Sequence, residues 1–244
     1  MKKVLMINGS PRKKNTYGFL VQIGEILTRR GFESEILNLS EYEIKPCSGC
    51  DDVCIHNHGC SEKNDDMAAL MQRILDSDGL VLSSPVYLRG VTSTFKAFAD
   101  RTNAWFHNPE TAGKPALLVA TTESTGVKET IQFLDSLATG FGARKGGSIT
   151  RVGKAMATPI REDELSKFIT LLEQDPGEYS PAMNELVIFV VQKLLAQRFE
   201  GENLKYWGGK DWLDKNYYYP CRINPAKNLF SMLMHKVIGN SMKG

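Results

Sequence analysis

The sequence has no apolar run long enough to cross a membrane. Its longest purely apolar stretch, about residues 186–191, is far shorter than the roughly 20 residues that a transmembrane helix needs. An excess of one charge is also absent, because 30 basic residues face 28 acidic ones and leave a net charge of +2. We therefore expect neither a nucleic acid nor a membrane among the partners of this chain.

The amino terminus lacks the long apolar segment of a secretory signal peptide, since only a handful of apolar residues precede the polar stretch that begins at Asn8. We therefore expect the chain to stay in the cytoplasm. The sequence contains five cysteines, and a reducing compartment disfavours a disulfide framework. Four of them lie between Cys47 and Cys60, and this crowding is the first specific indication of function.

The apolar pattern predicts a parallel α/β fold. Five short segments are predicted as strands. Residues 4–7 and 79–83 are typical of buried strands, residues 33–39 alternate between polar and apolar side chains, and residues 116–120 and 148–152 supply a fourth and a fifth candidate. The segments between them carry apolar residues at the helical period. Strands that alternate with helices imply βαβ crossovers, and hence a doubly wound five-stranded parallel sheet with helices on both faces. We assign this sheet to a domain of residues 1–158.

Residues 159–244 show only helical periodicity. Candidate helices at residues 162–173 and 181–197 precede a tail rich in aromatic side chains, including Trp207, Trp212 and residues 217–219. Such a density of large aromatic side chains must be packed against something. We interpret the segment as a C-terminal helical extension that acts as a lid, as a dimer arm, or as an aromatic belt on the surface of its own domain.

The loop at residues 9–16 follows the first predicted strand. Ligands of open parallel sheets bind at the carboxyl ends of the strands, and backbone amides together with a helix N-terminus suit a phosphate. The loop has no GxxxxGKS/T pattern, no GxGxxG follows a strand, and the loop holds no cysteine nucleophile. A bound phosphomonoester of a cofactor therefore remains. The simpler alternative is a polar turn in which Asn15 or Thr16 caps the next helix.

Two segments are informative together: NGSPRKKNT after the first predicted strand and SSPVYLRGVTSTFKAFADR after the third. They resemble the NAD(P)H-dependent FMN reductase family of flavodoxin-like proteins, and the cysteine-rich stretch between them resembles its iron–sulfur flavoprotein branch. The resemblance spans about residues 1–155. It implies a flavodoxin-like fold, an FMN cofactor and NAD(P)H as the electron donor.

The resemblance also implies which residues contact the cofactor. Four residues of the first loop would hold the FMN phosphate: Ser10, Arg12, Asn15 and Thr16. Five residues after the third strand would lie along or near the isoalloxazine ring: Pro85, Val86, Tyr87, Leu88 and Arg89. A flat apolar ring suits a loop that contains proline and an aromatic residue. The alternative for Tyr87 is a loop tyrosine that covers the helix starting near Thr94.

A third loop, at residues 121–126, follows the fourth predicted strand. Its backbone amides would face the pyrimidine edge of the flavin, where reduction places negative charge that fixed donors stabilise. The alternative is a cap for the helix at residues 127–137, and the two roles are compatible. The cofactor-binding candidates in this loop are Thr121, Glu123, Ser124 and Gly126.

The clustered cysteines have the spacing Cys47-x2-Cys50-x3-Cys54-x5-Cys60. Thiolates repel one another, so a cluster of four indicates a metal centre. Four cysteines on one compact loop suit a [4Fe–4S] cluster, whereas zinc more often uses two separated CxxC pairs. The iron–sulfur flavoproteins that this chain resembles typically carry C-x2-C-x2-C, and here one additional residue precedes Cys54.

Several alternatives to a four-cysteine cluster remain open. They are zinc, free thiols without metal, and replacement of a ligand by His56 or His58. A cluster would let electrons pass singly to and from the flavin, whereas its absence would leave a simple flavin or quinone reductase.

Together these features predict an FMN-dependent oxidoreductase that passes electrons from NAD(P)H through flavin, with or without an iron–sulfur cluster, to a quinone, flavin or protein acceptor. One alternative is an electron-transfer protein that docks a ferredoxin-like partner and has no nucleotide substrate. Another is a cysteine-based redox sensor. Because flavodoxin-like reductases commonly place the flavin near a dimer interface, the resemblance further implies a homo-oligomer.

Overall fold

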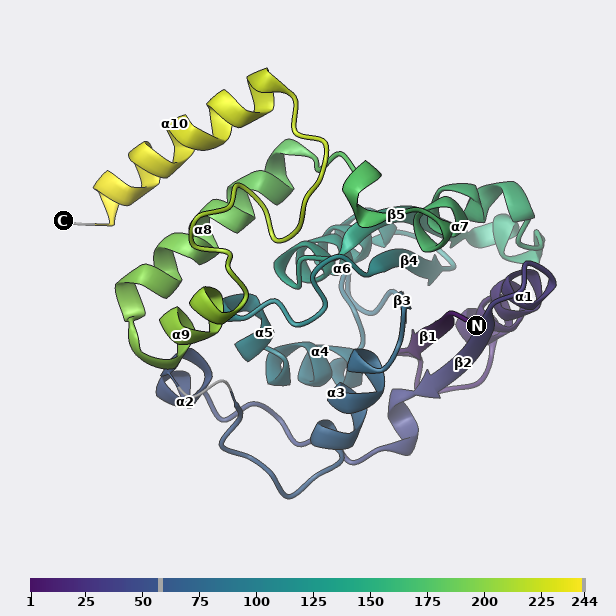
Figure 1. Ribbon diagram of the computed structural model, residues 1–244. Helices are drawn as coiled ribbons and strands as arrows, with labels where there is room; N and C mark the ends of the chain where they lie inside the picture. Colours follow the sequence, from purple (N-terminus) through teal and green to yellow (C-terminus); the bar gives the residue numbers. More distant parts are fainter. Residues whose placement is uncertain (57–58, 243–244) are drawn as a thin grey trace.

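The structure of the protein, a computed structural model, describes residues 1–56 and 59–242. Five strands form one sheet in which all neighbouring strands are parallel (Figure 1). They are β1 (Lys3–Asn8), β2 (Glu33–Asn38), β3 (Gly79–Pro85), β4 (Pro115–Thr122) and β5 (Arg144–Val152). Their spatial order, β2-β1-β3-β4-β5, confirms the predicted doubly wound sheet.

The helices are found mainly where the apolar period predicted them. In chain order, the α-helices are α1 (Asn15–Arg29), α2 (Asp51–His56), α3 (Met67–Leu75), α4 (Ser93–Arg101), α5 (Ala104–His107), α6 (Val127–Gly140), α7 (Ser166–Glu173), α8 (Met183–Phe199), α9 (Gly201–Gly209) and α10 (Pro225–Ser241). Short 3-10 helices occur at η1 (Leu39–Glu41), η2 (Gly153–Ala157), η3 (Glu162–Leu165) and η4 (Pro176–Glu178).

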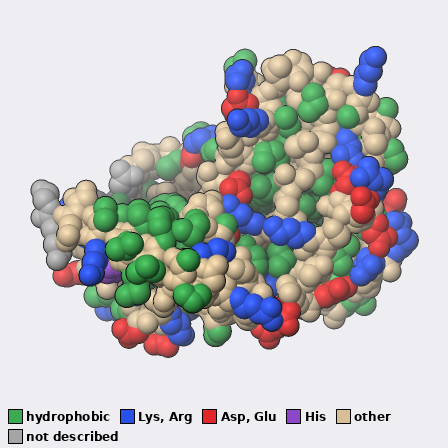
Figure 2. Space-filling view, turned by 90° about the horizontal axis from the view of Figure 1, so that it is seen from above, with side chains coloured by type: hydrophobic (Ala, Val, Ile, Leu, Met, Phe, Trp, Pro, Cys, Tyr) green, Lys and Arg blue, Asp and Glu red, His purple; other side chains and the backbone are tan. Residues whose placement is uncertain are grey.

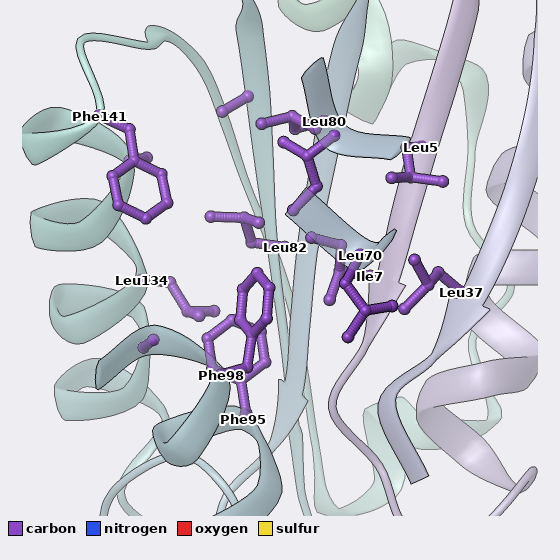
Figure 3. Close-up of a cluster of buried hydrophobic side chains, with 14 of the residues drawn as sticks. Leu5, Ile7, Leu37, Leu70, Leu80, Leu82, Phe95, Phe98, Leu134 and Phe141 are labelled. Atoms are coloured by element: carbon purple, nitrogen blue, oxygen red, sulfur yellow. The ribbon is translucent and has the colours of Figure 1, made fainter. Parts of the chain in front are cut away.

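The sheet lies between two helical layers, each with its own apolar core. Helices α1 and α7 pack on one face, where they bury alternate residues of β1 such as Val4 and Met6. Helices α3, α4 and α6 pack on the other face and bury Leu5 and Ile7 of the same strand. Figure 3 shows this second core, in which Phe95 and Phe98 of α4 and Leu134 of α6 meet leucines of β3. Both faces of the central strands β1, β3 and β4 are therefore buried, as their short apolar runs predicted.

Helix α7 packs against β4 and β5, so residues 162–173, which the sequence analysis placed in the extension, help to cover the sheet. Helices α8 and α9 and the chain after them form a separate aromatic cluster. Its buried members are Leu186, Phe189, Ala196, Trp207, Trp212, Tyr217 and Tyr218. Helix α10 lies along the outside of α8 (Figure 1). The aromatic side chains expected to need packing are thus packed against one another.

Among the described residues, four α-helices have no counterpart in the sequence analysis. Helices α2 and α5 have only six and four residues, too few to display a helical period. Helices α9 and α10 lie in the segment that we described only as an aromatic-rich tail. Among the described residues, no helix is both long enough and apolar enough to span a membrane.

Candidate functional site

A hollow of about 300 Å³ opens at the carboxyl ends of β1, β3 and β4. The parallel register brings three loops to this edge, because Asn8 lies beside Ser83 and Pro85 lies beside Thr121. The residues that line the hollow are Ser10, Arg12, Lys14, Asn15, Thr16, Pro85, Val86, Tyr87, Thr121, Thr122, Glu123, Ser124 and Met156. Ten of the thirteen candidate cofactor-binding residues therefore lie together at one site.

The first loop is held in place by hydrogen bonds within and beneath it. The Asn8 side chain accepts a bond from the Ser10 amide at 3.1 Å, and the Ser10 hydroxyl donates to the Arg12 carbonyl at 2.7 Å. Gly9 lies so close to α4 that a Cβ there would come within 2.7 Å of the Phe95 ring and 2.8 Å of the Ser83 carbonyl oxygen. Only glycine fits at that position, and it fixes the loop against the adjoining strand and helix.

Helix α1 begins beside the hollow without a side-chain cap. Lys14 is the N-cap residue and makes no capping hydrogen bond, so the predicted cap by Asn15 or Thr16 is wrong. The buried Thr16 hydroxyl instead lies 2.8 Å from the Thr121 hydroxyl, which joins the first loop to the third. Asn15 and the first turn of α1 are thus next to a hollow, with the partial positive charge of the helix end directed there.

The second loop makes a tight turn after β3. Tyr87 and Gly90 exchange two backbone hydrogen bonds of 2.9 and 3.0 Å, and the two residues between them, Leu88 and Arg89, have φ values of 47° and 64°. Left-handed backbone at two consecutive non-glycine residues costs about 1–2 kcal/mol for each residue. Pro85, Val86 and Tyr87 line the hollow, whereas Leu88 projects fully into solvent. Arg89 forms an ion pair with Glu129 of α6 instead of lining the hollow.

The third loop packs closely against the second. The Val86 amide donates to the Thr121 carbonyl at 2.8 Å. Gly126, with φ 89°, is the N-cap residue of α6, and a Cβ there would lie 2.8 Å from both the Arg89 Cα and a Val86 methyl carbon. Gly126 therefore lies behind the lining and lets the two loops approach each other, while Thr121, Glu123 and Ser124 face the hollow.

Sequence reasoning missed three residues of the lining. Lys14 and Thr122 lie within loops that were already identified, and no separate role had been assigned to them. Met156 comes from η2, after β5, and reaches the hollow across the end of the sheet. No local pattern distinguishes this methionine from one in a core, so its position becomes visible only in the fold.

The cysteine loop lies elsewhere, beyond the end of α4. Cys54 is buried in α2, and Cys50 just before this helix makes a hydrogen-bonding contact with it. Burial, followed by the neighbouring Cys50 and Cys60, raises the pKa of Cys54 to about 11. Hydrogen bonds from Ser61 lower the pKa of Cys50 to about 7. Three thiols are thus close enough to influence one another.

Arg101, at the end of α4, connects the two ends of the cysteine loop. Its guanidinium donates to the Cys60 sulfur at 3.1 Å, to the Lys45 carbonyl at 3.0 Å and to the Glu62 carbonyl at 2.8 Å. It also forms an ion pair with Asp65 in which both side chains are almost completely buried. Burial opposes ionisation of Asp65, but the bonds from Arg101 and nearby amides outweigh it and keep the pKa below its usual value. Such a buried pair is costly to break.

The C-terminal extension packs against the other side of the cysteine loop. The Asn203 side chain of α9 donates to the Ile55 carbonyl of α2, and it accepts a 2.7 Å bond from Asn108. The His56 ring meets the edge of Phe199 with 5.8 Å between centroids. The extension therefore braces helix α2, and none of its residues lines the hollow at the ends of the strands.

The four thiols do not form a metal site in this arrangement. Cys47 is exposed, and its sulfur accepts a 3.4 Å bond from the Gly49 amide. Within residues 1–56 and 59–242, no three histidine, cysteine or acidic side chains are grouped as metal ligands. His56 is engaged with Phe199, and His58 lies outside the described residues. The structure of the described residues therefore does not show the predicted [4Fe–4S] ligand set, and we derive no electron path through one.

Comparison with known proteins gives evidence on the family of this chain that is independent of the structure. The profile of the family described as NADPH-dependent FMN reductase matches residues 2–152. An iron–sulfur flavoprotein of Clostridioides difficile is 30% identical over 205 residues, which cover 79% of this chain and 90% of that protein. An iron–sulfur flavoprotein of Archaeoglobus fulgidus is 41% identical over 99 residues, or 41% of this chain. That match spans only 48% of the archaeal protein, about half of its length.

Solved structures agree on the fold. The crystal structure of RosB with a bound 8-demethyl-8-formylriboflavin 5′-phosphate intermediate is 15% identical, with a TM-score of 0.55 and coverage of 92% of each chain. An apo NADH:FMN oxidoreductase is 18% identical, with a TM-score of 0.51 over 71% of this chain and 87% of that one. At these identities the likeness concerns the fold alone, which is the flavodoxin-like arrangement expected from the sequence.

Proposed function

Since the chain belongs to the NADPH-dependent FMN reductase family, we propose that it is an FMN-dependent oxidoreductase that takes electrons from NADH or NADPH and delivers them to a quinone, flavin or protein acceptor. The observation that carries the proposal is the hollow in which the loops after β1, β3 and β4 meet. Its polar residues come from the start of α1 and from the loop after β4, and its apolar wall is formed by the loop after β3.

The polar end of the hollow has the donor set that a phosphate requires. The Ser10 and Thr16 hydroxyls, the Asn15 amide and the Arg12 guanidinium lie beside the N-terminus of α1. The helix end adds partial positive charge, and its first amides have no side-chain acceptor from the cap residue. These groups fit the FMN phosphate, and we assign them that role.

The remaining lining suits a flat ring with polar edges. Pro85, Val86 and Tyr87 supply an apolar wall, and the loop from Thr121 to Ser124 supplies backbone and hydroxyl groups opposite it. When bound, FMN supplies a ring that accepts hydride and releases electrons. The hydrogen bond from the Val86 amide to the Thr121 carbonyl, and the close approach of Gly126 to Arg89, keep the two sides of the hollow at a fixed separation.

The protein's contribution to the reaction is positioning. No acid or base of the chain is required for hydride transfer, so rate would come from stacking donor and acceptor against a fixed surface. Tyr87 is 42% exposed and borders both the hollow and solvent. We therefore assign it a contact with the nicotinamide or with the acceptor, and the ion pair with Glu129 holds Arg89 beside it.

Titration of the FMN-free protein with FMN tests the phosphate assignment. We expect Ser10→Ala and Arg12→Ala each to weaken FMN binding by about tenfold or more, since a hydrogen bond to a charged group contributes about 1.5–3 kcal/mol. Ser136→Ala is the matched control, because Ser136 is exposed on α6 and bonds only to Gln132. Equal affinities for all four proteins would overturn the assignment.

Steady-state oxidation of NADH and NADPH by the FMN-loaded protein tests the reaction. We expect turnover with a quinone or free flavin as acceptor, and a lower rate with Tyr87→Ala when the rates are compared per bound FMN. Negligible turnover, together with reduction by a protein donor such as a ferredoxin, would instead identify an electron-transfer protein.

A further inference from the structure

Helix α10 presents an apolar face to solvent. Leu229, Met232, Leu233 and Val237 are between 53% and 62% exposed. Their spacing of three, one and four residues places them on one side of the helix. Figure 2 shows the apolar surface that results. Of the ten large apolar side chains that are exposed within the described part of the chain, these are four.

The opposite side of α10 is fastened to the rest of the extension. Asn224 caps the helix by accepting a 2.8 Å bond from the Lys227 amide, and the Lys227 ammonium donates to the Pro181 carbonyl at 2.6 Å. At the other end, Arg198 of α8 donates to the Met242 carbonyl at 2.9 Å. Because the helix is held at both ends, its apolar face has a fixed orientation at the edge of the molecule (Figure 1).

Positive charge is concentrated in the same part of the chain. Residues 215–244 contain five lysines and arginines and no aspartate or glutamate. The other 214 residues contain 25 basic and 28 acidic residues. The positive balance of the chain therefore comes entirely from its last 30 residues. The small overall net charge conceals this asymmetry, because it averages over the whole chain.

A cationic hollow lies beneath the apolar face. It has a volume of about 280 Å³, lies between α8 and α10, and is lined in part by Lys193, Lys215, His235 and Lys236. Lys215 pairs with Asp211 at 3.0 Å. No ion pair of Lys193 or Lys236 is found among the described residues, and the Asp214 carboxylate acts on Lys193 from a longer distance. The Lys193 ammonium donates to the Lys215 carbonyl at 3.1 Å, which holds it at this hollow.

We propose that the outer face of α10 docks on an anionic phospholipid surface. The four apolar side chains enter the boundary between headgroups and acyl chains, and Lys236 and the hollow behind it bind lipid phosphates. An exposed helix with an apolar face and lysines but no acidic residues is typical of helices that lie in a membrane interface. The sequence-based expectation of no membrane partner was drawn from the length of the apolar runs and from the net charge of the whole chain, and this local pattern revises it.

Two features favour lipid over a protein occupant. The face carries leucine, methionine and valine but none of the tryptophan, tyrosine or arginine that dominate protein hot spots. A second copy of the chain would bring Lys236, which lies four residues after Met232 on the same side of the helix, towards like charges. An anionic lipid surface offers acyl chains to the apolar side chains and phosphates to the lysines.

Flotation of the FMN-loaded 244-residue chain with lipid vesicles tests the proposal. We expect binding to an equimolar mixture of phosphatidylglycerol and phosphatidylcholine, weakening as salt is raised because exposed charges are screened. The double variant Leu229→Glu/Leu233→Glu should lower the partition coefficient by at least about tenfold. Lys236→Gln should lower it by about fivefold, as expected for one lysine near such a surface. Val21→Glu on α1 is the matched control, since Val21 is an exposed apolar residue outside both sites.

Three outcomes would overturn the proposal. The first is absence of binding to the anionic vesicles, and the second is equal binding to vesicles of phosphatidylcholine alone. The third is a dimer, measured by sedimentation without lipid, that Leu229→Glu/Leu233→Glu dissociates, which would assign the face to a second copy. The melting temperature and FMN content of each variant serve as folding controls, and both should match those of the parent protein because the substituted residues are exposed.

Discussion

The hollow at the strand ends and the cysteine loop are both built around residues that the sequence singles out, yet only the first forms a coherent site. The loops of the hollow are short and each begins at the end of a strand, so the sheet register places them side by side. The cysteine loop spans more than twenty residues between β2 and α3, and its path depends on one buried arginine and on contacts with α9.

The difference shows which interactions fix the positions of the residues at each site. The hydrogen bonds between neighbouring strands fix the relative positions of the residues next to the strand ends. Residues in a long loop take their positions from side-chain contacts made with distant parts of the chain. Four experiments, ordered from the largest expected effect to the smallest, test the contacts that hold the hollow and those that hold the cysteine loop.

Arg101→Ala should have the largest effect. It leaves Asp65 buried without its partner, and removal of one member of a buried ion pair costs about 3–5 kcal/mol of unfolding free energy. Chemical denaturation measures the loss. Lys96→Ala on the same helix is the control, since Lys96 and Asp100 form an exposed pair and the change should stay within about 1 kcal/mol. Similar, small losses in both variants would show that Arg101 does not hold the loop.

Gly126→Ala should come second and act on the hollow. Its positive φ and the 2.8 Å approach of its would-be Cβ to Arg89 and Val86 predict a loss of about 2 kcal/mol or more. FMN affinity should fall with it, as the two loops are pushed apart. Gly18→Ala is the control, because Gly18 lies in α1 with open space around it and alanine there should stabilise by about 0.5–1 kcal/mol. Unchanged stability of Gly126→Ala would contradict the packing described for the loops.

Thr16→Val should cost less, about 1–2 kcal/mol. It leaves the Thr121 hydroxyl buried without the partner that lies 2.8 Å away. Replacing both threonines by valine should recover most of the loss, since no polar group is then left unpaired. Thermal unfolding of the two single variants and the double variant gives the coupling energy. Additive losses would mean that the hydroxyls do not interact.

Thiol labelling should show the smallest effect, a difference in rates without a change of stability. In protein shown to be free of iron, Cys50 should react faster as the pH rises through about 7, where its thiolate forms. Cys54 should react slowly up to pH about 9, because it is buried and its pKa is raised to about 11. Peptide mass spectrometry after brief alkylation measures both, with Cys221, whose pKa burial also raises to about 11, as the slow reference. Equal rates would contradict the described loop.

The sequence was most informative where structure is local. Short apolar or alternating segments predicted five strands, and residues that follow the first, third and fourth of them do line one hollow. Leu88, Arg89 and Gly126 lie in the predicted loops, but in the structure they do not line the hollow. A tight turn and a left-handed glycine direct them elsewhere. Their roles depend on φ angles that spacing does not reveal.

The sequence was least informative where distant segments meet. Nothing near Asn203 indicates that its amide would hold the carbonyl of Ile55, and nothing near Met156 indicates a place at the hollow. The apolar residues of α10 are periodic, but periodicity alone does not say which side of a helix is covered. These features arise from tertiary packing, which a linear pattern does not encode.

The positions of the three tryptophans have a practical consequence. Trp105 belongs to the core on the α3–α4–α6 side of the sheet, whereas Trp207 and Trp212 belong to the aromatic cluster of the extension, and all three are buried. The Trp207 indole donates to the His107 carbonyl at 2.8 Å across the junction between the two parts. Intrinsic tryptophan fluorescence thus reports on the sheet domain through Trp105 and on the extension through Trp207 and Trp212. A red shift retained in a Trp105→Phe variant reports detachment of the extension, without any added dye.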